Sequence, residues 1–238
     1  MTSAERLRQE RRVEFRRRLL EATEELLRGG ASFTELGVER LAVAAGSSRP
    51  TFYVYFKGKT ELLAEFAEQV LADVAGALGR LWQQGAAPID ALQMLDAVRD
   101  VIAAFRRHQL VLAAIAEVAG YTAEIDEAFR GQIERNAEYT REFLEREQAQ
   151  GRVRDIDLEQ TARVITWMVE RCCAQMLREP PGAADDRLAI ALTEMIWAAV
   201  YLEDAGIRHR SSEQVSDRPE CHHRGAPRHR AHGQRERQ

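Results

Sequence analysis

Cysteine is scarce in this chain of 238 residues, which has three, two of them adjacent at Cys172 and Cys173. Such an odd set provides no disulfide framework, so a disulfide-held secreted scaffold is excluded and a reducing compartment is expected. Long apolar runs are also missing. A run such as Leu110 to Ala116 is far shorter than the roughly 20 residues of a membrane span. Because the N-terminus is charged from Glu5 onward and has no apolar signal core, we expect a cytoplasmic protein with no membrane partner.

The chain also lacks the residue patterns of common enzymes. It contains no His-Glu-x-x-His, no repeated Glu-x-x-His and no phosphate-binding glycine loop. Between residues 61 and 206 the single histidine is His108, and that segment offers no Ser/His/Asp set. An all-α enzyme is therefore a rival interpretation that these absences disfavour. We expect neither an enzyme nor a cofactor.

Strand-like alternation is absent too, and helical periodicity takes its place. Apolar residues recur every three or four positions, as at Leu62, Phe66 and Val70, which places them on one face of a helix. Glycine and proline separate the periodic segments. Helices are predicted at about 13–28, 38–45, 48–56, 59–84, 89–106, 109–119, 122–149, 157–178 and 185–204. The predicted fold class is all-α.

The net charge of −4 conceals three differently charged segments. Residues 1–60 carry 12 Lys/Arg against 8 Asp/Glu, a net of +4, and residues 61–206 carry 14 against 26, a net of −12. Residues 207–238 carry 8 against 4, again +4. A basic head on an acidic body indicates that one end of the chain meets a polyanion.

Residues 207–238 have almost no aliphatic side chains and could not bury a core, so a disordered Arg/His-rich tail is predicted. A metal site is the tempting alternative, because the tail holds Cys221, His222, His223, His229 and His232. Their spacings match no standard zinc pattern. No metal is predicted.

The segment from Phe33 to Phe66 carries the pattern that decides the function. Two short helices joined by the turn Ala45-Gly46-Ser47 form a helix-turn-helix unit, in which small residues allow close crossing. Ser48 has the chemistry to cap the second helix, and Pro50 fits its first turn. Phe52 and Phe56, four residues apart, can anchor that helix to the core.

The remaining face of the second helix suits a DNA duplex. Arg49 can donate a fork of hydrogen bonds to guanine, while the Thr51 methyl and the Pro50 ring suit a thymine methyl. Hydroxyl groups, lysines and free helix N–H groups nearby suit phosphate oxygens. The predicted DNA-binding residues are Thr34, Ser48, Arg49, Pro50, Thr51, Tyr53, Tyr55, Lys57 and Lys59.

This pattern resembles the DNA-binding signature of the tetracycline-repressor (TetR) family. The matching run is Phe33-x4-Val38-x2-Leu41-Ala42-x2-Ala45-Gly46-x-Ser48-x2-Thr51-Phe52-Tyr53-x-Tyr55-Phe56-x2-Lys59-x2-Leu62-Leu63. Ser48 to Tyr53, Glu170-Arg171 and Ile196-Trp197 are similar to the ethionamide-repressor (EthR-like) branch. The family resemblance implies nine or ten helices, dimerisation through the last two, and a default role as a repressor.

The resemblance also implies an effector cavity between the central helices. The candidate lining is mostly aliphatic and aromatic, which suits an elongated lipophilic molecule, although each residue could equally be plain core. The predicted ligand-binding residues are Met94, Val98, Val101, Phe105, Phe129, Ile133, Asn136, Thr166 and Val169. That branch has a tryptophan and two asparagines at the positions of Met94, Thr166 and Val169, so its own ligand is not carried over.

Apolar residues on more than one face of the last two helices predict a homodimer with a two-fold four-helix interface. The predicted dimerisation residues are Ile165, Met168, Cys172, Met176, Leu192, Met195, Ile196 and Ala199. A dimer could place two reading helices about 34–36 Å apart, in successive major grooves of a palindromic operator.

Together these patterns predict four segments. Residues 1–12 form a flexible basic arm, 13–60 a three-helix helix-turn-helix DNA-binding domain, 61–206 a helical ligand-binding and dimerisation domain, and 207–238 the disordered tail. The predicted protein is a homodimeric regulator, by default a repressor, that binds double-stranded DNA and is released by a small lipophilic effector. The alternative left open is a DNA-binding regulator with no small-molecule ligand, controlled by a protein partner.

Overall fold

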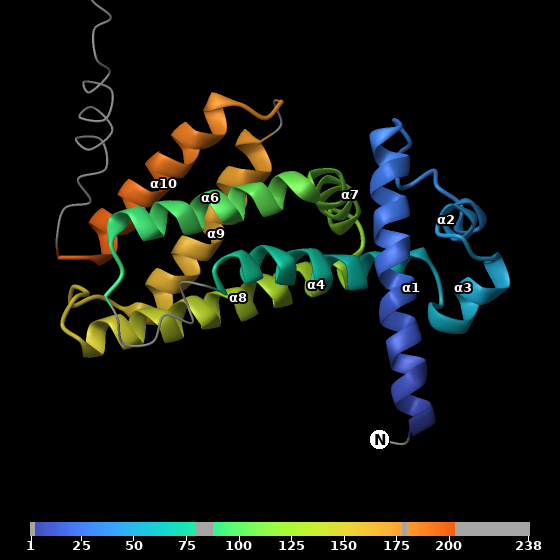
Figure 1. Cartoon of the computed structure of the whole chain (residues 1–238), viewed down its shortest axis with the longest axis horizontal. Coiled ribbons are helices and arrows are strands. Elements are labelled where there is room, and N and C mark those ends of the chain that lie inside the picture. Colours follow the sequence, from blue (N-terminus) through green and yellow to red (C-terminus); the bar gives the residue numbers. More distant parts are fainter. Residues whose placement is uncertain (1–2, 80–87, 178–179, 203–238) are drawn as a thin grey trace, which may run out of the picture. The chain divides into compact units, whose positions relative to one another are not determined.

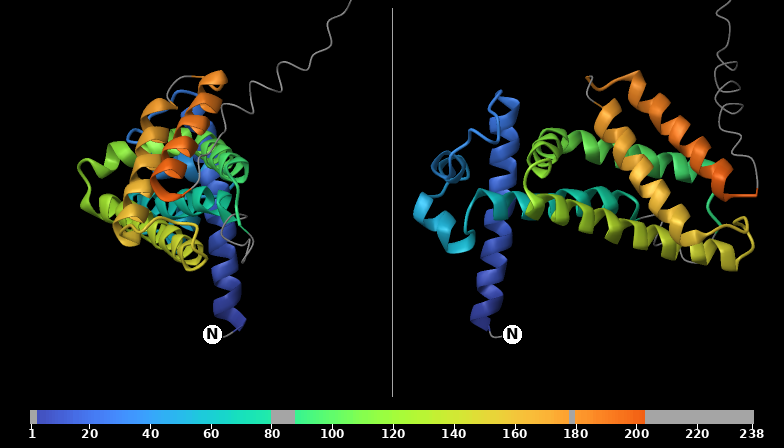
Figure 2. Two further views of the ribbon diagram at one scale, coloured as in Figure 1. Left: turned by 90° about the vertical axis from the view of Figure 1, so that its left-hand side faces the viewer. Right: turned by 180° about the vertical axis from the view of Figure 1, so that it is seen from behind.

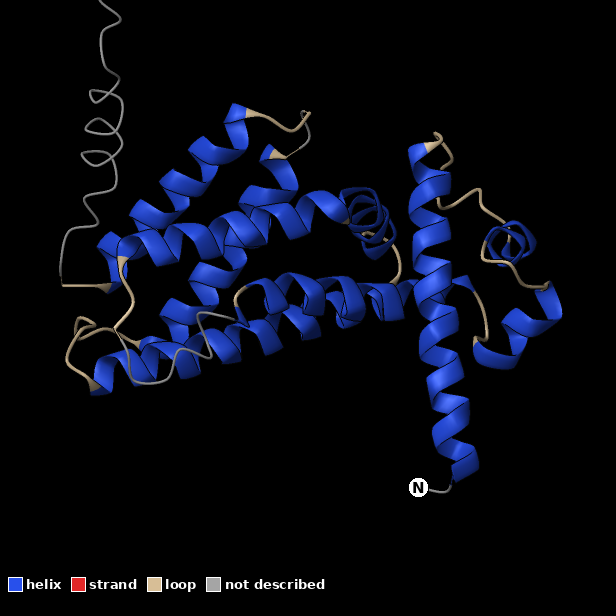
Figure 3. Ribbon diagram, in the orientation of Figure 1, coloured by secondary structure: helices blue, strands red, loops and turns tan. Residues whose placement is uncertain are grey.

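The computed structural model describes residues 3–79, 88–177 and 180–202. Within these ranges the chain is helical and has no β-strand (Figure 1 and Figure 3). The helices are α1 (Ser3–Arg28), α2 (Val38–Ala44), α3 (Arg49–Tyr55), α4 (Lys59–Ala77), α6 (Ala91–Arg107), α7 (Gln109–Ala119), α8 (Ala123–Ala149), α9 (Leu158–Met176) and α10 (Ala183–Val200). The all-α prediction is confirmed.

The prediction of a flexible arm at residues 1–12 was wrong from Ser3 onward, because helix α1 already begins there. The Arg12 guanidinium explains part of this order. It forms ion pairs with Glu61 and Glu65 of α4 and lies 5.3 Å from the centroid of the Phe56 ring. Contacts with α4 therefore fix the helix where the sequence showed only polar residues.

Several predictions reach residues that the structure does not describe. These are the last residues of the predicted 59–84, 157–178 and 185–204 helices, and the whole 207–238 tail with its cysteine and histidines. Within the described residues, no group of three or more His, Cys, Asp or Glu side chains could hold a metal ion. No helix in the described part of the chain is both long and apolar enough to span a bilayer.

The core of the N-terminal helices is built on aromatic rings. Phe15 of α1, Phe52 of α3 and Phe56 are each at most 2% exposed. The Phe56 ring centroid lies 5.3 Å from that of Phe52 and 6.2 Å from that of Phe15. The same cluster of buried residues continues through α4 into α7 and α8, so the helix-turn-helix unit and the following helices share one core.

The turn between α2 and α3 depends on Gly46, whose φ is +66°. Side chains with a Cβ rarely adopt that left-handed conformation. The sequence argument gave Gly46 a different role, close crossing of the two helices. A Cβ at this position would meet no atom closer than the Arg18 Nη1 atom at 3.8 Å. Backbone conformation, rather than lack of space, therefore requires the glycine.

The remaining helices pack in pairs around α4. Helix α8 runs beside both α4 and α9, and α10 packs on α6 (Figure 2). An isolated β-bridge between Val153 and Tyr201 ties the loop before α9 to the end of α10. The Arg154 N–H donates to the Val200 carbonyl at 3.0 Å, and its Nε donates to the Tyr201 carbonyl at 2.9 Å. These bonds fix where α10 ends.

Candidate functional site

Helix α3 is held at its start by Ser48 and along its inner face by phenylalanine. Ser48 is the N-cap, and its Oγ accepts a hydrogen bond from the Thr51 N–H at 3.3 Å. The two hydroxyl groups lie 2.9 Å apart. Phe52 faces the core, whereas Tyr53 is exposed and Thr51, another predicted DNA contact, is half-buried. Both the cap and the anchor were predicted from the sequence.

The exposed face of α3 presents the chemistry expected for a major groove. Arg49 and Pro50 are exposed, and Tyr53 is 48% exposed. The Arg49 guanidinium lies 5.8 Å from the centroid of the Tyr53 ring, which steadies the fork of donors before any partner arrives. Val54 is 57% exposed on the same helix and was missed. The sequence could have predicted this exposure, because position 54 lies on the opposite side of the helix from the buried residues Phe52 and Phe56.

Two of the predicted DNA-binding residues, Tyr55 and Lys59, also make contacts within the fold. The Tyr55 ring is half-buried and lies 5.5 Å from the Phe15 ring, so its outward placement was wrong. The Lys59 ammonium donates to the carbonyl oxygens of Phe33 and Thr34, both at 2.9 Å. Burial lowers the pKa of Lys59. Its ammonium therefore fastens the loop before α2 to α4 through two of its three N–H donors.

Lys57 and Thr34 remain exposed beside the reading helix. The Lys57 N–H donates to the Glu61 carboxylate in the first turn of α4, while its side chain points to solvent. The Thr34 hydroxyl lies 2.7 Å from that of Ser32. Both residues keep the exposure that a phosphate contact needs.

A small cavity lies between α4, α6, α8 and α9, and we call it the inner cavity. Its volume is about 70 Å³, and its α4 wall is formed by Leu71, Val74, Ala75 and Leu78. Six predicted ligand-binding residues line it, namely Val101, Phe105, Ile133, Asn136, Thr166 and Val169. Met94 and Val98 are buried and line neither this cavity nor the pocket described below, so their assignment stays a prediction.

The polar groups of the inner cavity are mostly occupied by neighbours. Asn136 donates from Nδ2 to the Leu71 carbonyl at 3.3 Å and accepts at Oδ1 from Gln132 at 3.0 Å. The Thr166 hydroxyl donates to the Ala162 carbonyl of its own helix at 2.9 Å. Since a buried polar group needs a partner, these bonds leave a wall that behaves as apolar.

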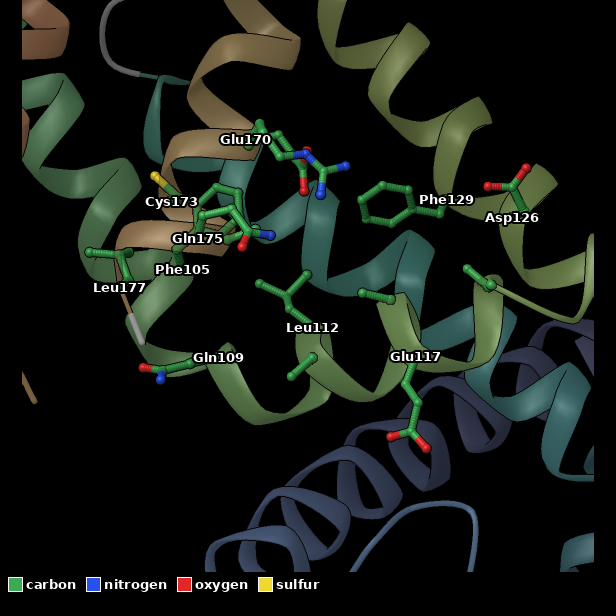
Figure 4. A pocket seen from close by; sticks show the side chains of 16 residues that line it. Phe105, Gln109, Leu112, Glu117, Asp126, Phe129, Glu170, Cys173, Gln175 and Leu177 are labelled. Atoms are coloured by element: carbon green, nitrogen blue, oxygen red, sulfur yellow. The ribbon is translucent and has the colours of Figure 1, made fainter. Parts of the chain in front are cut away.

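A second, larger space opens between α7, α8 and α9, and we call it the outer pocket (Figure 4). Its volume is about 740 Å³, within the range of small-molecule sites. Phe129, the remaining predicted ligand-binding residue, lines it. Phe105 and Glu170 line both the outer pocket and the inner cavity, so the two spaces meet at these side chains.

His108 connects the cavity region to the first helix. It follows Phe105 by three residues, at the junction of α6 and α7, and is 9% exposed. Its Nδ1 lies 2.6 Å from the Glu24 Oε1 atom of α1, and its Nε2 lies 3.5 Å from the Asp73 Oδ2 atom of α4. A displacement of α6 at Phe105 would therefore act directly on both α1 and α4.

Comparison with known proteins assigns both halves of this arrangement. Residues 19–66 match the family model described as bacterial regulatory proteins, tetR family. Residues 94–202 match the C-terminal domain of the transcriptional regulator EthR. The chain belongs to the tetR family. It falls in the EthR-like branch, whose members are DNA-binding transcriptional regulators.

Relatives and solved structures agree with this placement. The HTH-type transcriptional regulator EthR of Mycobacterium tuberculosis is 25% identical over 185 residues, covering 77% of this chain and 86% of the relative. The Mycolicibacterium smegmatis EthR is 27% identical over 184 residues, covering 76% and 83%. A TetR-family regulator from Mesorhizobium loti has the same fold, with a TM-score of 0.63, 19% identity, and coverage of 81% and 99%. The Bacillus subtilis FadR, solved with stearoyl-CoA, has a TM-score of 0.60, 13% identity, and coverage of 77% and 98%.

In this tetR-family protein, six of the predicted dimerisation residues are at least partly accessible to a partner, and two are buried in the core of their own chain. Met176, Met195 and Ala199 are exposed, and Ile165, Met168 and Cys172 are half-buried. Leu192 and Ile196 are 2% and 6% exposed, so placing them at an interface was wrong.

The helical period of α10 explains the error. Positions 188, 192 and 196 turn toward the core of their own chain, and 191, 195 and 199 turn away from it. Val164 and Leu202 are also exposed and were missed.

Proposed function

We propose that this tetR-family protein is a homodimeric repressor that binds a palindromic operator and is released by a small lipophilic effector. Residues 13–60 read the DNA through α3, and residues 61–206 bind the effector and the second subunit. The reading surface consists of Arg49, Pro50, Tyr53 and Val54, all exposed on one short helix. Lys57 and Thr34 flank it with phosphate contacts.

The observation that carries the proposal is the junction at Phe105. Its ring lines both the inner cavity and the outer pocket, and the same stretch of chain leads to His108 with its contacts to α1 and α4. An effector bound at this ring therefore acts on a residue that contacts the DNA-reading half.

The size of the inner cavity supports a change of state on binding. A volume of about 70 Å³ is far below the roughly 300–1,000 Å³ of small-molecule sites. An apolar chain can enter only if the α4 wall, with Leu71 and Val74, moves outward. Close-packed cores resist added volume, so binding favours a second arrangement in which α4 has shifted. Because α4 begins directly after the reading helix, this shift alters the spacing of two heads in a dimer.

Exposed apolar residues on α9 and α10 support the homodimer. Val164 and Met176 of α9, Met195 of α10 and Leu202 just after α10 are each more than half exposed. A second copy of these helices would cover them. Sedimentation of the full-length protein should give a dimer, and Met195→Glu should shift it toward monomer. A wild-type monomer at all concentrations contradicts this part of the proposal.

The test of function is an in-vitro selection of random duplexes with the purified full-length protein. We expect a palindrome, with half-sites about 10 base pairs apart or a multiple of that spacing. Lipophilic compounds should then raise the thermal midpoint and weaken binding to the selected site. No enrichment at moderate salt would contradict DNA reading by this protein alone. If a site is enriched but no compound affects binding to it, the small-molecule effector is wrong and the alternative, control by a protein partner, takes its place.

A further inference from the structure

Glu170 on α9 is a buried carboxylate where the two cavities meet. The residue is 6% exposed and lines both the inner cavity and the outer pocket. Its Oε2 atom is buried and has no hydrogen-bond partner. Among the described residues that line these two spaces, it alone has such an atom.

The neighbours of Glu170 compensate its charge only in part. The closest cation is Arg171, whose Nε lies 3.6 Å from Oε2, beyond hydrogen-bond distance. The Arg171 side chain is 61% exposed, so water screens much of its charge. Burial raises the pKa of Glu170, and Arg171 offsets this only in part. An isolated buried carboxylate is costly, and such groups are concentrated at functional sites.

The surroundings of the carboxylate favour a positive charge. Figure 4 shows the Glu170 side chain, from α9, and the Phe129 ring, from α8, pointing toward the same part of the outer pocket. An aromatic face attracts cations, and Trp167 supports the Phe129 ring edge-on at 6.5 Å. The pocket is lined by three carboxylates and one guanidinium, and Asp126 is already paired with Arg130. The remaining charge is therefore negative.

We propose that the effector is an amphipathic cation, whose ammonium group pairs with Glu170 beside Phe129 while its apolar chain enters the inner cavity. This inference rests on the proposed function and adds the chemical class of the effector. The two spaces fit the two ends of such a molecule, because the roomy pocket carries the charge and the narrow cavity is apolar. Ligand binding supplies the partner that the free protein lacks for Oε2.

The experiment compares three probes of equal chain length, namely decylamine, decanol and decanoate, each below its micelle concentration. Calorimetric titration at pH 7 uses the full-length protein. Decylamine is protonated at this pH, since alkylamines titrate near 10.4 as lysine does. We expect decylamine to bind about tenfold to a hundredfold more tightly than decanol, as for a hydrogen bond to a charged group. Decanoate should bind most weakly.

Two glutamate variants distinguish the effect of the Glu170 charge from the effect of the pocket's overall negative charge. Glu170→Gln should abolish the preference for decylamine and leave the affinity for decanol within about twofold, since the shape of the site is retained. Glu117→Gln removes an exposed carboxylate at the edge of the same pocket and should keep the preference. If Glu170→Gln does not fold, as judged by lost decanol binding, Glu170→Asp retains the charge and should retain part of the preference.

The outcomes distinguish this inference from the function on which it rests. If decanol binds and weakens operator binding as well as decylamine does, the cation is wrong and the lipophilic effector stands. An undiminished preference in Glu170→Gln also overturns the role of Glu170. If none of the three probes binds, the lipophilic effector itself is wrong, and the cation with it.

Discussion

The helix-turn-helix head and the helical body that follows it differ in how their polar side chains are bonded. In the head, the Ser48 hydroxyl caps α3, the Lys59 ammonium donates to two carbonyls, and Arg12 pairs with two glutamates. The Nε atoms of Arg16 and Arg18 are buried without a partner, but each guanidinium donates through Nη1, to Glu65 and to the Ala45 carbonyl respectively. In the body, the walls of the inner cavity are similarly satisfied, yet Glu170 is buried at the junction without a hydrogen bond to Oε2. The head is arranged to keep one shape. The body keeps a group whose interactions are incomplete until something binds, which is the condition for a ligand to change its state.

The largest expected difference between the two regions is in packing. Phe52→Ala removes a fully buried ring from the head and should lower the free energy of unfolding by about 3–5 kcal/mol. Phe129→Ala removes a half-buried ring that borders the outer pocket and should cost less than half as much. Denaturant titration of both variants measures this. Equal losses would mean that the pocket wall is as tightly packed as the head.

Removing a reading side chain should weaken DNA binding without unfolding the head. We expect Arg49→Ala to reduce affinity for the selected operator by about 1–3 kcal/mol, the range of a bidentate contact with guanine. Its thermal midpoint should stay unchanged, because the side chain is exposed. Arg99→Ala is the control, since it removes the same charge from an exposed pair with Asp186 in the body. Equal effects of the two variants on binding would contradict base reading by Arg49.

Two glycine substitutions should act in opposite directions. Gly46→Ala places a Cβ on a left-handed residue and should destabilise the head by about 1–2 kcal/mol. Gly76→Ala fills an open position on the exposed side of α4 and should stabilise the protein by about 0.5–1 kcal/mol. Thermal unfolding of both variants tests the claim that conformation, and not space, selects Gly46. Gly46→Ala with wild-type stability would refute it.

The link between head and body can be measured without any effector. A double-mutant cycle on Glu24→Ala and His108→Ala should give a coupling energy of about 1 kcal/mol in unfolding, as for side chains in contact. The same cycle with the exposed Glu21, which pairs with Arg17 on α1, should give none. A coupling energy of zero between Glu24 and His108 would contradict the proposal that a displacement at Phe105 acts on α1 through this contact.

The smallest expected effect concerns pH. The pKa of Glu170 is raised in the folded protein, so its carboxylate opposes folding once pH exceeds the ordinary glutamate value of about 4.3. Below that value the group is protonated in both the folded and unfolded states, and the penalty is absent. Glu170→Gln should therefore be more stable than wild type at pH 7, with the gain vanishing as pH falls toward 4. A gain that is the same at both pH values would point to packing instead of charge.

The sequence predicted the head better than the body, for a physical reason. Local rules govern the head, since Ser48 and Pro50 mark the start of α3 and the spacing of Phe52 and Phe56 defines its buried face. Tyr55 was misplaced because the extended α1, with Phe15, covers a side of α3 that sequence spacing leaves open.

In the body, all the apolar positions look alike along the chain. Met94 and Val98 share the periodicity of Val101 and Phe105, yet the cavity lies only beside the second pair. Leu192 and Met195 were likewise grouped together, although one packs on the core and the other faces out. Which stripe meets which neighbour depends on the crossing of helices, and that information is not local.

The inward position of Phe52 and Phe56 has a consequence for how such regulators diversify. The side chains that fix α3 in place are separate from those at 49, 53 and 54, which project from the fold. Substitutions at the projecting positions can therefore alter the recognised base sequence at almost no cost to folding. After a gene duplication, one copy could acquire a new operator in a few steps while the effector response is inherited intact.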